Sequence, residues 1–438
     1  MKPSLFALVL LALLTAVPAR AQAPPLTLTL DDAVSRALAG SHRLAEAGAR
    51  HDVAEAVVGQ RQAAQQPQVT ALAGYTRTNH IDPFGLQTPD GQFRVIYPDV
   101  PDNYRTRVDV ALPLYTGGRL QAFERAARQE STATSGDVDA VRADVRLETE
   151  RAFWALVVAD ESLTLVTESL TRSAAHVGNV RSALQAGLVP PNDLLTAEAQ
   201  QARQRMQQAQ GRSARAVAEA DLARLIGVPV GTALAPVRPS AADAGEGDVA
   251  ALVARAVAQR RDRQAIVDRQ SAAATRVEAA AALRRPAVAV AGGVDYANPN
   301  PRIFPRQAAW RTSWDASVSV SWALFDGGRA RAEGAEAVAA KRVLDARLRE
   351  LDSVIALEIQ QRLSEIDASG VALQAADAEL AAATEALRVV NDRYAAGVAI
   401  SSDVLDAQVL VLQASLDRTQ ATASRQLAAA RLRRAIGQ

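Results

Sequence analysis

The chain has 438 residues, enough for two or three ordinary domains, and its 49 basic and 48 acidic side chains nearly cancel, so no charge bias points to a nucleic-acid partner. Aromatic residues make up only 4% of the sequence, which favours long, slender helices over bulky cores. The absence of cysteine excludes disulfides, thiolate catalysis and cysteine-based metal sites.

Residues 1–23 have the pattern of a secretory signal peptide. Lys2 gives the positive start, and an apolar stretch runs from Leu5 to Val17. Either Ala19 with Ala21 or Ala21 with Ala23 provides the pair of small residues of a cleavage site. The alternative, a membrane anchor, fits less well because the apolar stretch is short for a bilayer, so we expect cleavage and export. No later stretch reaches about 18 uncharged apolar residues, and any membrane is therefore expected to be crossed by strands.

Residues 24–227 form the first of two predicted repeats, and residues 228–247, rich in Pro, Gly and Ala, form the predicted linker. The elements expected in the first repeat are an amphipathic helix at 30–66, strands at 68–80 and 103–116, a very long helix at 119–186 that a glycine turn breaks, and a shorter helix at 193–226.

Residues 248–438 repeat this order, with a helix expected at 248–285, strands at 286–297 and 309–326, a long helix at 329–396 and a shorter helix at 403–436. Gly117 and Gly327 lie 210 positions apart, and the same spacing relates "LQAGLVPPNDLLTA" (184–197) to "YAAGVAISSDVLDA" (394–407). Chance similarity between Ala-rich helices does not reproduce glycine and aspartate at one spacing, so we interpret the pattern as a tandem duplication. Upstream the spacing becomes 219, which places about nine extra residues between the first two strands, in an expected surface loop.

The strands alternate strictly between apolar and polar residues. Along 310–324 one side carries Trp310, Thr312, Trp314, Ala316, Val318, Val320, Trp322 and Leu324, and the other carries Arg311, Ser313, Asp315, Ser317, Ser319 and Ser321. Along 104–114, Tyr104, Thr106, Val108, Val110, Leu112 and Leu114 oppose Arg105, Arg107 and Asp109. A soluble sandwich is the commoner setting for one such strand, but this length, with charges on the inner side and tryptophans on the outer, is typical of an outer-membrane barrel strand.

Four strands cannot close a barrel alone, and open edges in lipid would leave backbone groups unpaired. We therefore expect several copies of the chain to share one barrel. The long helices carry apolar residues at alternating steps of three and four, a heptad stripe suited to coiled-coil packing, and about 68 helical residues reach roughly 100 Å.

The glycine pairs Gly117–Gly118 and Gly327–Gly328 lie where a strand is predicted to turn directly into a long helix. Glycine tolerates the backbone angles of such a junction, and Thr116 and Asp326 precede the pairs as expected helix caps. We interpret these glycines as structural rather than as a phosphate-binding loop.

The doubled order of strand, strand, "GGR", long helix and glycine turn resembles the TolC family of outer-membrane efflux proteins over essentially the whole mature chain. The resemblance implies a homotrimer in which three chains pool four strands each into a twelve-stranded membrane β-barrel that continues into a periplasmic tunnel of coiled-coil helices. It implies a passive exit duct, without cofactor, that receives substrates from an inner-membrane pump of RND, ABC or MFS type through a periplasmic adaptor protein.

The resemblance also assigns roles to residues at the helix turns. Gly187, Leu188, Gly397 and Val398 would form the tips where the adaptor docks. Asp403 and Asp406 fall on the family's constriction carboxylates, Asp193 takes the first of these places in the first repeat, and Tyr394 falls on a gate tyrosine. Thr196 takes the second of these places in the first repeat. Ala399 stands where the family has a gating arginine, so the latch of the gate is expected to differ in detail. The alternative for Asp193 and Asp403 is structural, because acids favour the first turn of a helix.

Other candidate sites are weak. The four histidines form no His-Glu-x-x-His pattern, so solvated histidines are expected rather than metal ligands; they are His42, His51, His80 and His176. The Gln-rich stretch 199–210 is expected to be a solvated helix face, with a place in the tunnel lining as the alternative. No nucleophile or phosphate motif supports an enzyme. A periplasmic coiled-coil scaffold or adhesin stalk is the competing hypothesis, and it would need neither a tryptophan-rich lipid face nor a place in the outer-membrane fraction.

Overall fold

The computed structural model describes residues 24–239 and 247–438, so the expected signal peptide at 1–23 and part of the expected linker lie outside the described residues. The chain divides into two compact units, each built from segments far apart in sequence. The unit that we call the sheet unit takes Arg43–Ala143, Val249–Ile359 and Ala435–Gln438. The helical unit takes residues up to His42, Asp144–Asp248 and Gln360–Arg434.

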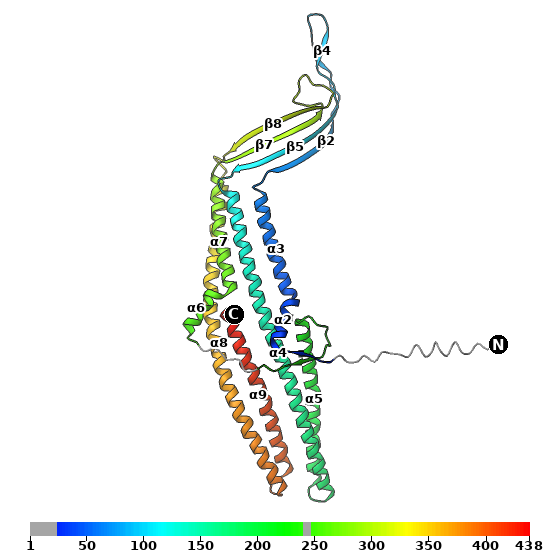
Figure 1. The fold of residues 1–438 in the computed structure, drawn as a ribbon, viewed down its shortest axis with the longest axis vertical. Coiled ribbons are helices and arrows are strands. Elements are labelled where there is room, and N and C mark those ends of the chain that lie inside the picture. Colours follow the sequence, from blue (N-terminus) through cyan, green and yellow to red (C-terminus); the bar gives the residue numbers. More distant parts are fainter. Residues whose placement is uncertain (1–23, 240–246) are drawn as a thin grey trace, which may run out of the picture. The chain divides into compact units, whose positions relative to one another are not determined.

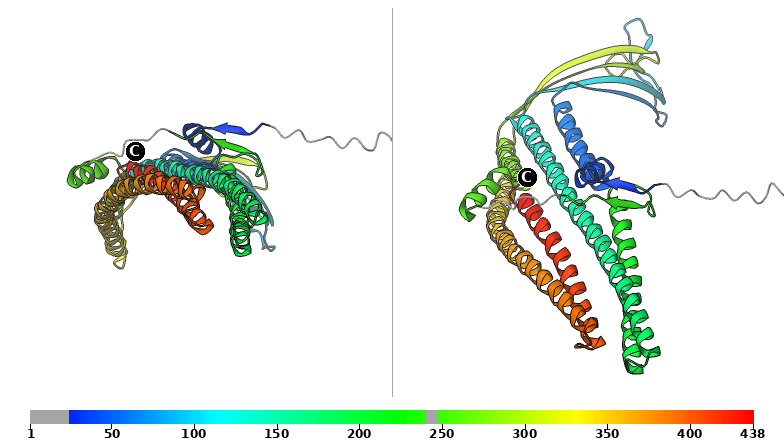
Figure 2. Two further views of the ribbon diagram at one scale, coloured as in Figure 1. Left: turned by 90° about the horizontal axis from the view of Figure 1, so that it is seen from below. Right: turned by 60° about the horizontal axis from the view of Figure 1, so that its bottom comes forward.

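The sheet unit is organised around a four-stranded antiparallel sheet in the order β2–β5–β7–β8 (Figure 1). Its strands are β2 (Gln68–Arg77), β5 (Asp102–Tyr115), β7 (Ala287–Asn298) and β8 (Arg311–Ser321). Because β5 pairs with β7, the strands of both halves of the sequence share one sheet. The sheet is curved (Figure 2), and β2 and β8 each have one edge that no other strand of the described chain pairs.

The helices of the sheet unit are α3 (His42–Ala63), α6 (Val249–Gln259), α7 (Arg261–Ala281) and the first parts of α4 (Arg119–Gln185) and α8 (Arg329–Ala395). Ion pairs hold α7 to both long helices. The Arg269 guanidinium bonds Glu130 and Asp137 of α4, and Arg263 Nε donates to Asp352 Oδ1 of α8 at 2.6 Å.

The helical unit contains the remaining parts of α4 and α8 with α2 (Leu30–Gly40), α5 (Pro191–Leu225) and α9 (Ser401–Ala435). A chain reversal joins α4 to α5 and another joins α8 to α9, giving two helical hairpins (Figure 1). Phe153 and Leu156 of α4 are fully buried, and Arg215 Nε of α5 donates to Asp160 Oδ1 of α4 at 2.6 Å. None of the helices in the described ranges is long and apolar enough to cross a membrane.

Both amphipathic helices predicted from the sequence are in fact broken. Ser41 has an extended backbone (φ −71°, ψ 113°) that separates α2 from α3. Arg260, at φ −65° and ψ 121°, separates α6 from α7 in the same way. The apolar periodicity continues across each break, which is why the sequence predicted single helices.

Three further predictions are corrected. The strand expected at 309–326 ends at Ser321, which lies opposite Ala287, the first residue of β7, and Pro286 before it has no N–H to extend the ladder. The extra residues of the first half form a hairpin of β3 (Phe84–Gln87) and β4 (Phe93–Tyr97) rather than a plain loop. The expected linker contains β6 (Leu234–Pro236), which pairs in parallel with β1 (Leu26–Leu28).

Candidate functional site

The two faces of the four-stranded sheet differ in chemistry, as the alternation predicts. Val108, Val294 and Trp314 are aligned across three strands on one face, and the next register places Asp109 and Asp315 on the other. The apolar face is exposed: Trp314 keeps 74% of its surface accessible and Val294 keeps 50%. An exposed apolar surface of this extent marks contact with something other than water.

Aromatic side chains gather on the apolar face at one end of the sheet. The rings of Tyr75 and Tyr104 are 5.0 Å apart, those of Tyr296 and Trp310 stack at 4.8 Å, and Tyr104 lies 5.9 Å from Trp310. We call these four residues the aromatic cluster. Rings with one apolar and one polar edge suit the boundary between lipid and water.

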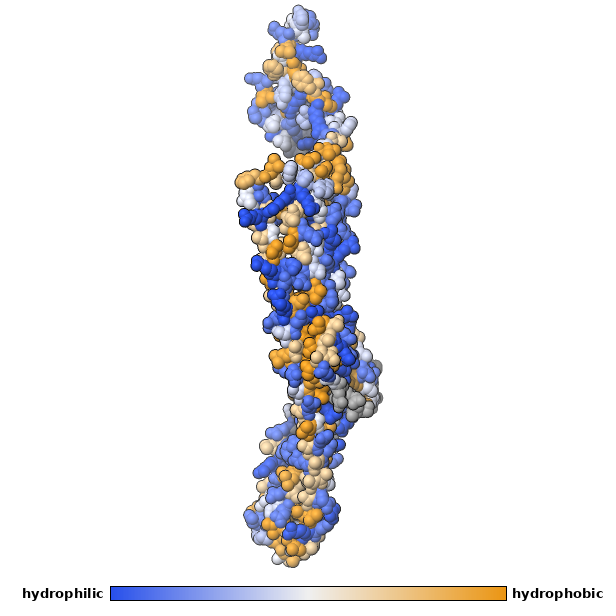
Figure 3. Space-filling model, turned by 90° about the vertical axis from the view of Figure 1, so that its left-hand side faces the viewer, coloured by the Kyte–Doolittle hydropathy of each residue, from blue (hydrophilic) through white to orange (hydrophobic). Residues whose placement is uncertain are grey.

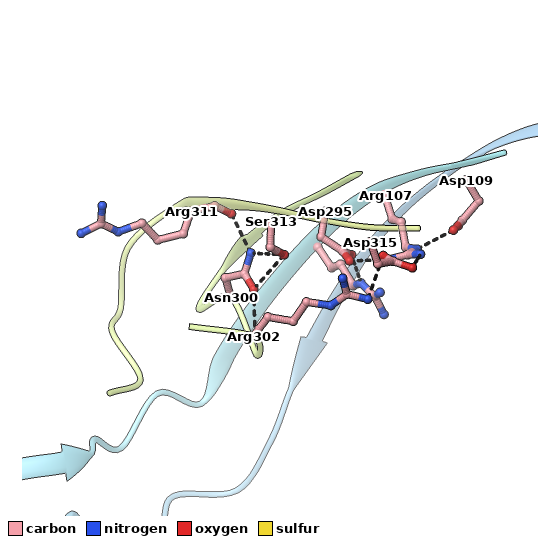
Figure 4. Close-up of polar contacts among 9 residues, drawn as sticks. Arg107, Asp109, Asp295, Asn300, Arg302, Arg311, Ser313 and Asp315 are labelled. Carbon is pink, nitrogen blue, oxygen red and sulfur yellow. Dashed lines mark hydrogen bonds and ion pairs between the residues drawn. The ribbon is translucent and has the colours of Figure 1, made fainter. Parts of the chain in front are cut away.

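An ion-pair network occupies the polar face (Figure 4). Arg107 of β5 lies at its centre: Nε donates to Asp109 Oδ1 at 2.6 Å, Nη1 is 2.9 Å from Asp315 Oδ1, and the guanidinium also bonds Asp295. Arg105 Nε donates to Asp295 Oδ1 at 2.6 Å. The network therefore joins β5, β7 and β8 on the face opposite the aromatic cluster.

The strand-to-helix junctions have the predicted geometry. Gly117 and Gly118 have φ of +66° and +87°, and Gly327 and Gly328 have +66° and +90°. These angles lie in the left-handed region, where residues with a Cβ are disfavoured. Asp326 caps α8, since its carboxylate accepts from Gly328 N at 2.9 Å and Ala330 N at 2.7 Å. Thr116 Oγ1 accepts more weakly from Leu120 N, at 3.3 Å.

Apolar side chains are exposed beside the second junction. Trp322, Leu324 and Phe325 keep 59%, 81% and 91% of their surface accessible, and Trp322 Nε1 donates to the Arg284 carbonyl at 3.0 Å. Figure 3 shows apolar side chains gathered near the place where the sheet meets the helices of its unit.

The turns of the two helical hairpins share one motif. Gly397 N donates to the Tyr394 carbonyl and Val398 N to the Arg393 carbonyl, at 3.0 and 2.9 Å, and Gly187 N and Leu188 N make the matching bonds in the other hairpin. This is the Schellman arrangement, which requires a left-handed residue at the glycine. Leu188 and Val398, 78% and 67% exposed, therefore project from the turns.

The acidic residues after the turns differ in their contacts. The Asp403 carboxylate accepts a hydrogen bond from Ile400 N at 3.3 Å. This is the bond by which the third residue of a helix caps its start, so Asp403 has a structural role at the start of α9. Pro190 takes the place of Ile400 in the first hairpin and has no N–H, so Asp193 cannot make that bond. Asp406 is exposed one turn beyond Asp403, and its carboxylate has no hydrogen-bond partner among the described residues.

Tyr394 contacts a residue that the sequence reasoning placed in solvent. The Tyr394 ring lies 5.7 Å from the ring of His176 of α4, and His176 Nε2 shares a 2.8 Å hydrogen bond with Ser401 Oγ of α9. His176 is buried, and burial lowers the pKa of its imidazole. The expectation of a solvated histidine is wrong here, because the two hairpins of the chain meet at this side chain.

A buried polar stripe continues along α4 from His176. Ser173 and Ser169 precede it at helical spacing and are both buried, and Gln204 Nε2 of α5 donates to Ser169 Oγ at 3.1 Å. Gln204 is 1% exposed, so the Gln-rich stretch is not uniformly solvated as predicted. Its burial depends on packing between helices, which composition does not report. Across the described ranges, no cluster of three or more His, Asp or Glu side chains is placed to hold a metal ion.

Comparison with known proteins gives one family and one fold. The model of the outer membrane efflux protein family matches residues 33–228 and 252–438. Protein CyaE of Bordetella pertussis is 29% identical over 322 residues, which are 71% of this chain and 63% of that protein, so the match spans less than two thirds of that relative.

Solved structures match over nearly the whole chain. The outer membrane protein VceC of Vibrio cholerae has a TM-score of 0.76 at 20% identity, with 93% of this chain and 96% of that chain covered. The open state of the MtrE outer membrane channel of Neisseria gonorrhoeae has a TM-score of 0.77 at 20% identity, with 93% and 88% covered. At these identities the likeness establishes the fold.

Proposed function

The chain belongs to the outer membrane efflux protein family, and we propose that it is the exit duct of a tripartite efflux or type I secretion system. In this role it conducts substrates passively from an inner-membrane pump, through the periplasm, to the outside. Its location is the outer membrane, and the family and fold are those of passive channels rather than of enzymes.

The observation that carries the proposal is a sheet with one exposed apolar face, one polar face and two open edges. Unpaired backbone groups in lipid cost several kcal/mol each, so β2 of one protomer is expected to pair with β8 of the next. Three protomers with four strands each would close a twelve-stranded barrel. The Arg107 network would then line the lumen, and the aromatic cluster would lie at a lipid boundary.

The helices supply the length of the duct. α4 and α8 have 67 residues each, which correspond to roughly 100 Å of helix. Packed side by side from three protomers, they would form the wall of a periplasmic tunnel whose narrow end lies at the hairpin turns.

At these turns Asp403, Asp406, Asp193 and Tyr394 are proposed to form the constriction. Asp406 is the strongest candidate, because it is exposed and no cap contact explains it. Asp403 serves the helix cap as well, and the two roles are compatible.

The exposed turns Gly187–Leu188 and Gly397–Val398 are proposed to dock a periplasmic adaptor. Their apolar side chains project into solvent and suit a hydrophobic contact between helix ends. The pump is of RND, ABC or MFS type.

The oligomer is tested by cross-linking between edge strands. The chain has no cysteine, so Ala71→Cys in β2 combined with single cysteines along β8, from Ser313 to Ser319, gives unambiguous disulfides. We expect at least one pair to yield a covalent species of three chains and no larger one, because a closed ring cannot grow. A monomer at every register, or an open ladder beyond three, would exclude the closed barrel. Pairs between β2 and the interior strand β7 are the matched control and should not cross-link protomers.

Transport is tested separately in cells. Deletion of the gene should raise sensitivity to toxic compounds or block secretion of a pump substrate, and the intact chain should restore it. A chain that assembles in the outer membrane but restores no export with any pump would contradict the duct and leave the barrel standing.

A further inference from the structure

At the end of β7 nearest the aromatic cluster, burial is the reverse of what a barrel strand predicts. Val294 and Tyr296, on the apolar face, are 50% and 49% exposed, whereas Asp295 and Ala297, on the polar face, are 2% and 1% exposed. A polar face that lined an open lumen would leave such side chains accessible to water. Arg105 and Arg107, which both bond the Asp295 carboxylate, account for part of this burial. A segment of the chain that bonds Ser313 and Asp315 lies over the same face.

The covering segment is residues 299–310, the connection between β7 and β8, which we call the strap. Asn300, 2% exposed, fixes its start: Nδ2 donates to the Arg311 carbonyl at 2.9 Å and to Ser313 Oγ at 3.0 Å, and Oδ1 accepts from Arg302 N at 3.0 Å. Ser313 is in register with Asp295 on the polar face, so the strap contacts that face directly (Figure 4).

Arg302 shows how far the strap reaches. Its Nη2 is 2.8 Å from Asp315 Oδ1, and Asp315 also bonds Arg107. Asp315 lies four positions into β8 from Arg311, which is about 13 Å along the strand at roughly 3.3 Å per residue. The strap therefore turns back over the polar face rather than extending away from the strand ends.

Arg306 fixes the other end of the strap. Its backbone N–H donates to the Ile96 carbonyl at 3.2 Å, Nη1 donates to Tyr97 Oη at 2.8 Å, and Nη2 donates to Asn103 Oδ1 at 2.6 Å. These partners belong to β4 and β5. The strap is thus attached to β8 on one side and to β4 and β5 on the other, and its prolines restrict its backbone further.

We propose that the strap is an outer constriction, which sets an upper size limit on the solutes that leave the barrel. The inference rests on the proposed function, because it requires the polar face to line the lumen. With three protomers, three straps narrow the mouth from three sides. Phe304, near the middle of the strap and 77% exposed, is available to contact a passing solute or the strap of another protomer.

The test measures access to the polar face from outside the cell. Ser317→Cys places a single thiol on that face, two positions beyond Asp315. Intact cells are treated with a small maleimide and with maleimides that carry neutral polyethylene glycol chains of increasing mass. Leu86→Cys, on the β3–β4 hairpin and 58% exposed, is the reporter that every reagent should reach.

We call the strap released when Asn300→Ala and Arg302→Ala together remove its bonds to the Arg311 carbonyl, Ser313 and Asp315. The bond that Gln307 Oε1 accepts from Arg311 Nη2 at 3.1 Å remains in this variant. We expect Ser317→Cys to react with the small maleimide in both backgrounds. Large reagents should label Ser317→Cys slowly when the strap is native and about tenfold or more faster when the strap is released. The reason is that the substitutions remove several hydrogen bonds of the buried Asn300, and their loss shifts the strap towards open positions by about that factor. Arg94→Ala, an exposed arginine of β4, is the matched control and should change nothing.

Two results would overturn the constriction while the duct stands. One is labelling of Ser317→Cys by large reagents as fast as Leu86→Cys with the native strap, and the other is an unchanged size limit after release. A failure of the small maleimide to reach Ser317→Cys, when it does reach Leu86→Cys, would mean that the polar face does not line an open lumen. That outcome would remove the duct and the strap together.

Discussion

Arginine at Ala316 should prevent insertion into the outer membrane, whereas arginine at the adjacent Ser317 should be tolerated. Ala316 is in register with Gly292 on the apolar face, and Ser317 is in register with Ala291 on the polar face. The two variants carry the same side chain at neighbouring positions of one strand. They differ only in the face of the sheet that receives the charge.

The magnitude follows from the depth of Ala316. Trp310 directly precedes β8 and Trp322 directly follows it, 12 residues later. This separation is about 40 Å along the strand, or about 30 Å along the membrane normal at a tilt of roughly 40°. This matches the hydrocarbon thickness of a bilayer, and Ala316 is midway. A lipid-facing arginine at mid-depth costs about 2–4 kcal/mol per chain, so about 6–12 kcal/mol in the proposed trimer.

The assay is folding into lipid vesicles across a denaturant series, combined with the heat-modifiable mobility of the oligomer on gels. Ser317→Arg should fold within about 1 kcal/mol of the native chain, since its side chain would meet water. The face assignment is refuted if Ser317→Arg destabilises the oligomer as much as Ala316→Arg, or if both variants insert normally.

Three further predictions concern the junctions and the hairpin turns. Gly117→Ala and Gly327→Ala each place a Cβ on a residue at φ +66°, which costs about 1–2 kcal/mol of stability. Only at Gly117 would the new Cβ also lie 2.7 Å from Arg285 Cβ, so Gly117→Ala should lower the melting temperature more than Gly327→Ala does. Equal losses in the two variants would argue against the contact with Arg285. Because burial lowers the pKa of His176, the contact with Tyr394 and Ser401 has its full stability above the ordinary histidine pKa of about 6.5 and loses it as pH falls from there through the lowered pKa of the folded chain. Hydrogen exchange at 394–403, corrected for its intrinsic pH dependence, should therefore increase below about pH 6.5, and His176→Phe should abolish that increase. In planar bilayers the channel should be cation-selective, and Asp406→Asn should weaken this selectivity while the oligomer stays intact. If the double variant Asp403→Asn, Asp406→Asn leaves the reversal potential unchanged, neither acid lines the pore, and both serve only the start of α9.

Features that depend on a short period or a local rule could be predicted from the sequence. The faces of β5 and β8 follow from alternation, and the caps at Thr116 and Asp326 follow from the residues next to the glycine pairs. Burial of His176 could not be predicted in this way, because it depends on Ser401, 225 positions away. The strap was missed for the same reason, since its anchors Asn103 and Tyr97 lie some 200 residues before Arg306.

The two halves of the chain agree where packing constrains them and differ where the proposed duct has its ends. Strands must share one sheet register and long helices one heptad stripe, so neither half can change alone without losing contacts in the other. Turns and loops escape these constraints and can diverge. In the first half Pro190 excludes the cap bond that Asp403 makes in the second, and the β3–β4 hairpin supplies an anchor for the strap. Asp403, Asp406, Tyr394 and the strap all come from the second half. The first half therefore supplies supporting contacts, from His176 at the helical turns and from Tyr97 of the β3–β4 hairpin to the strap. The second half carries most of the residues proposed to narrow the duct at its entrance and at its exit.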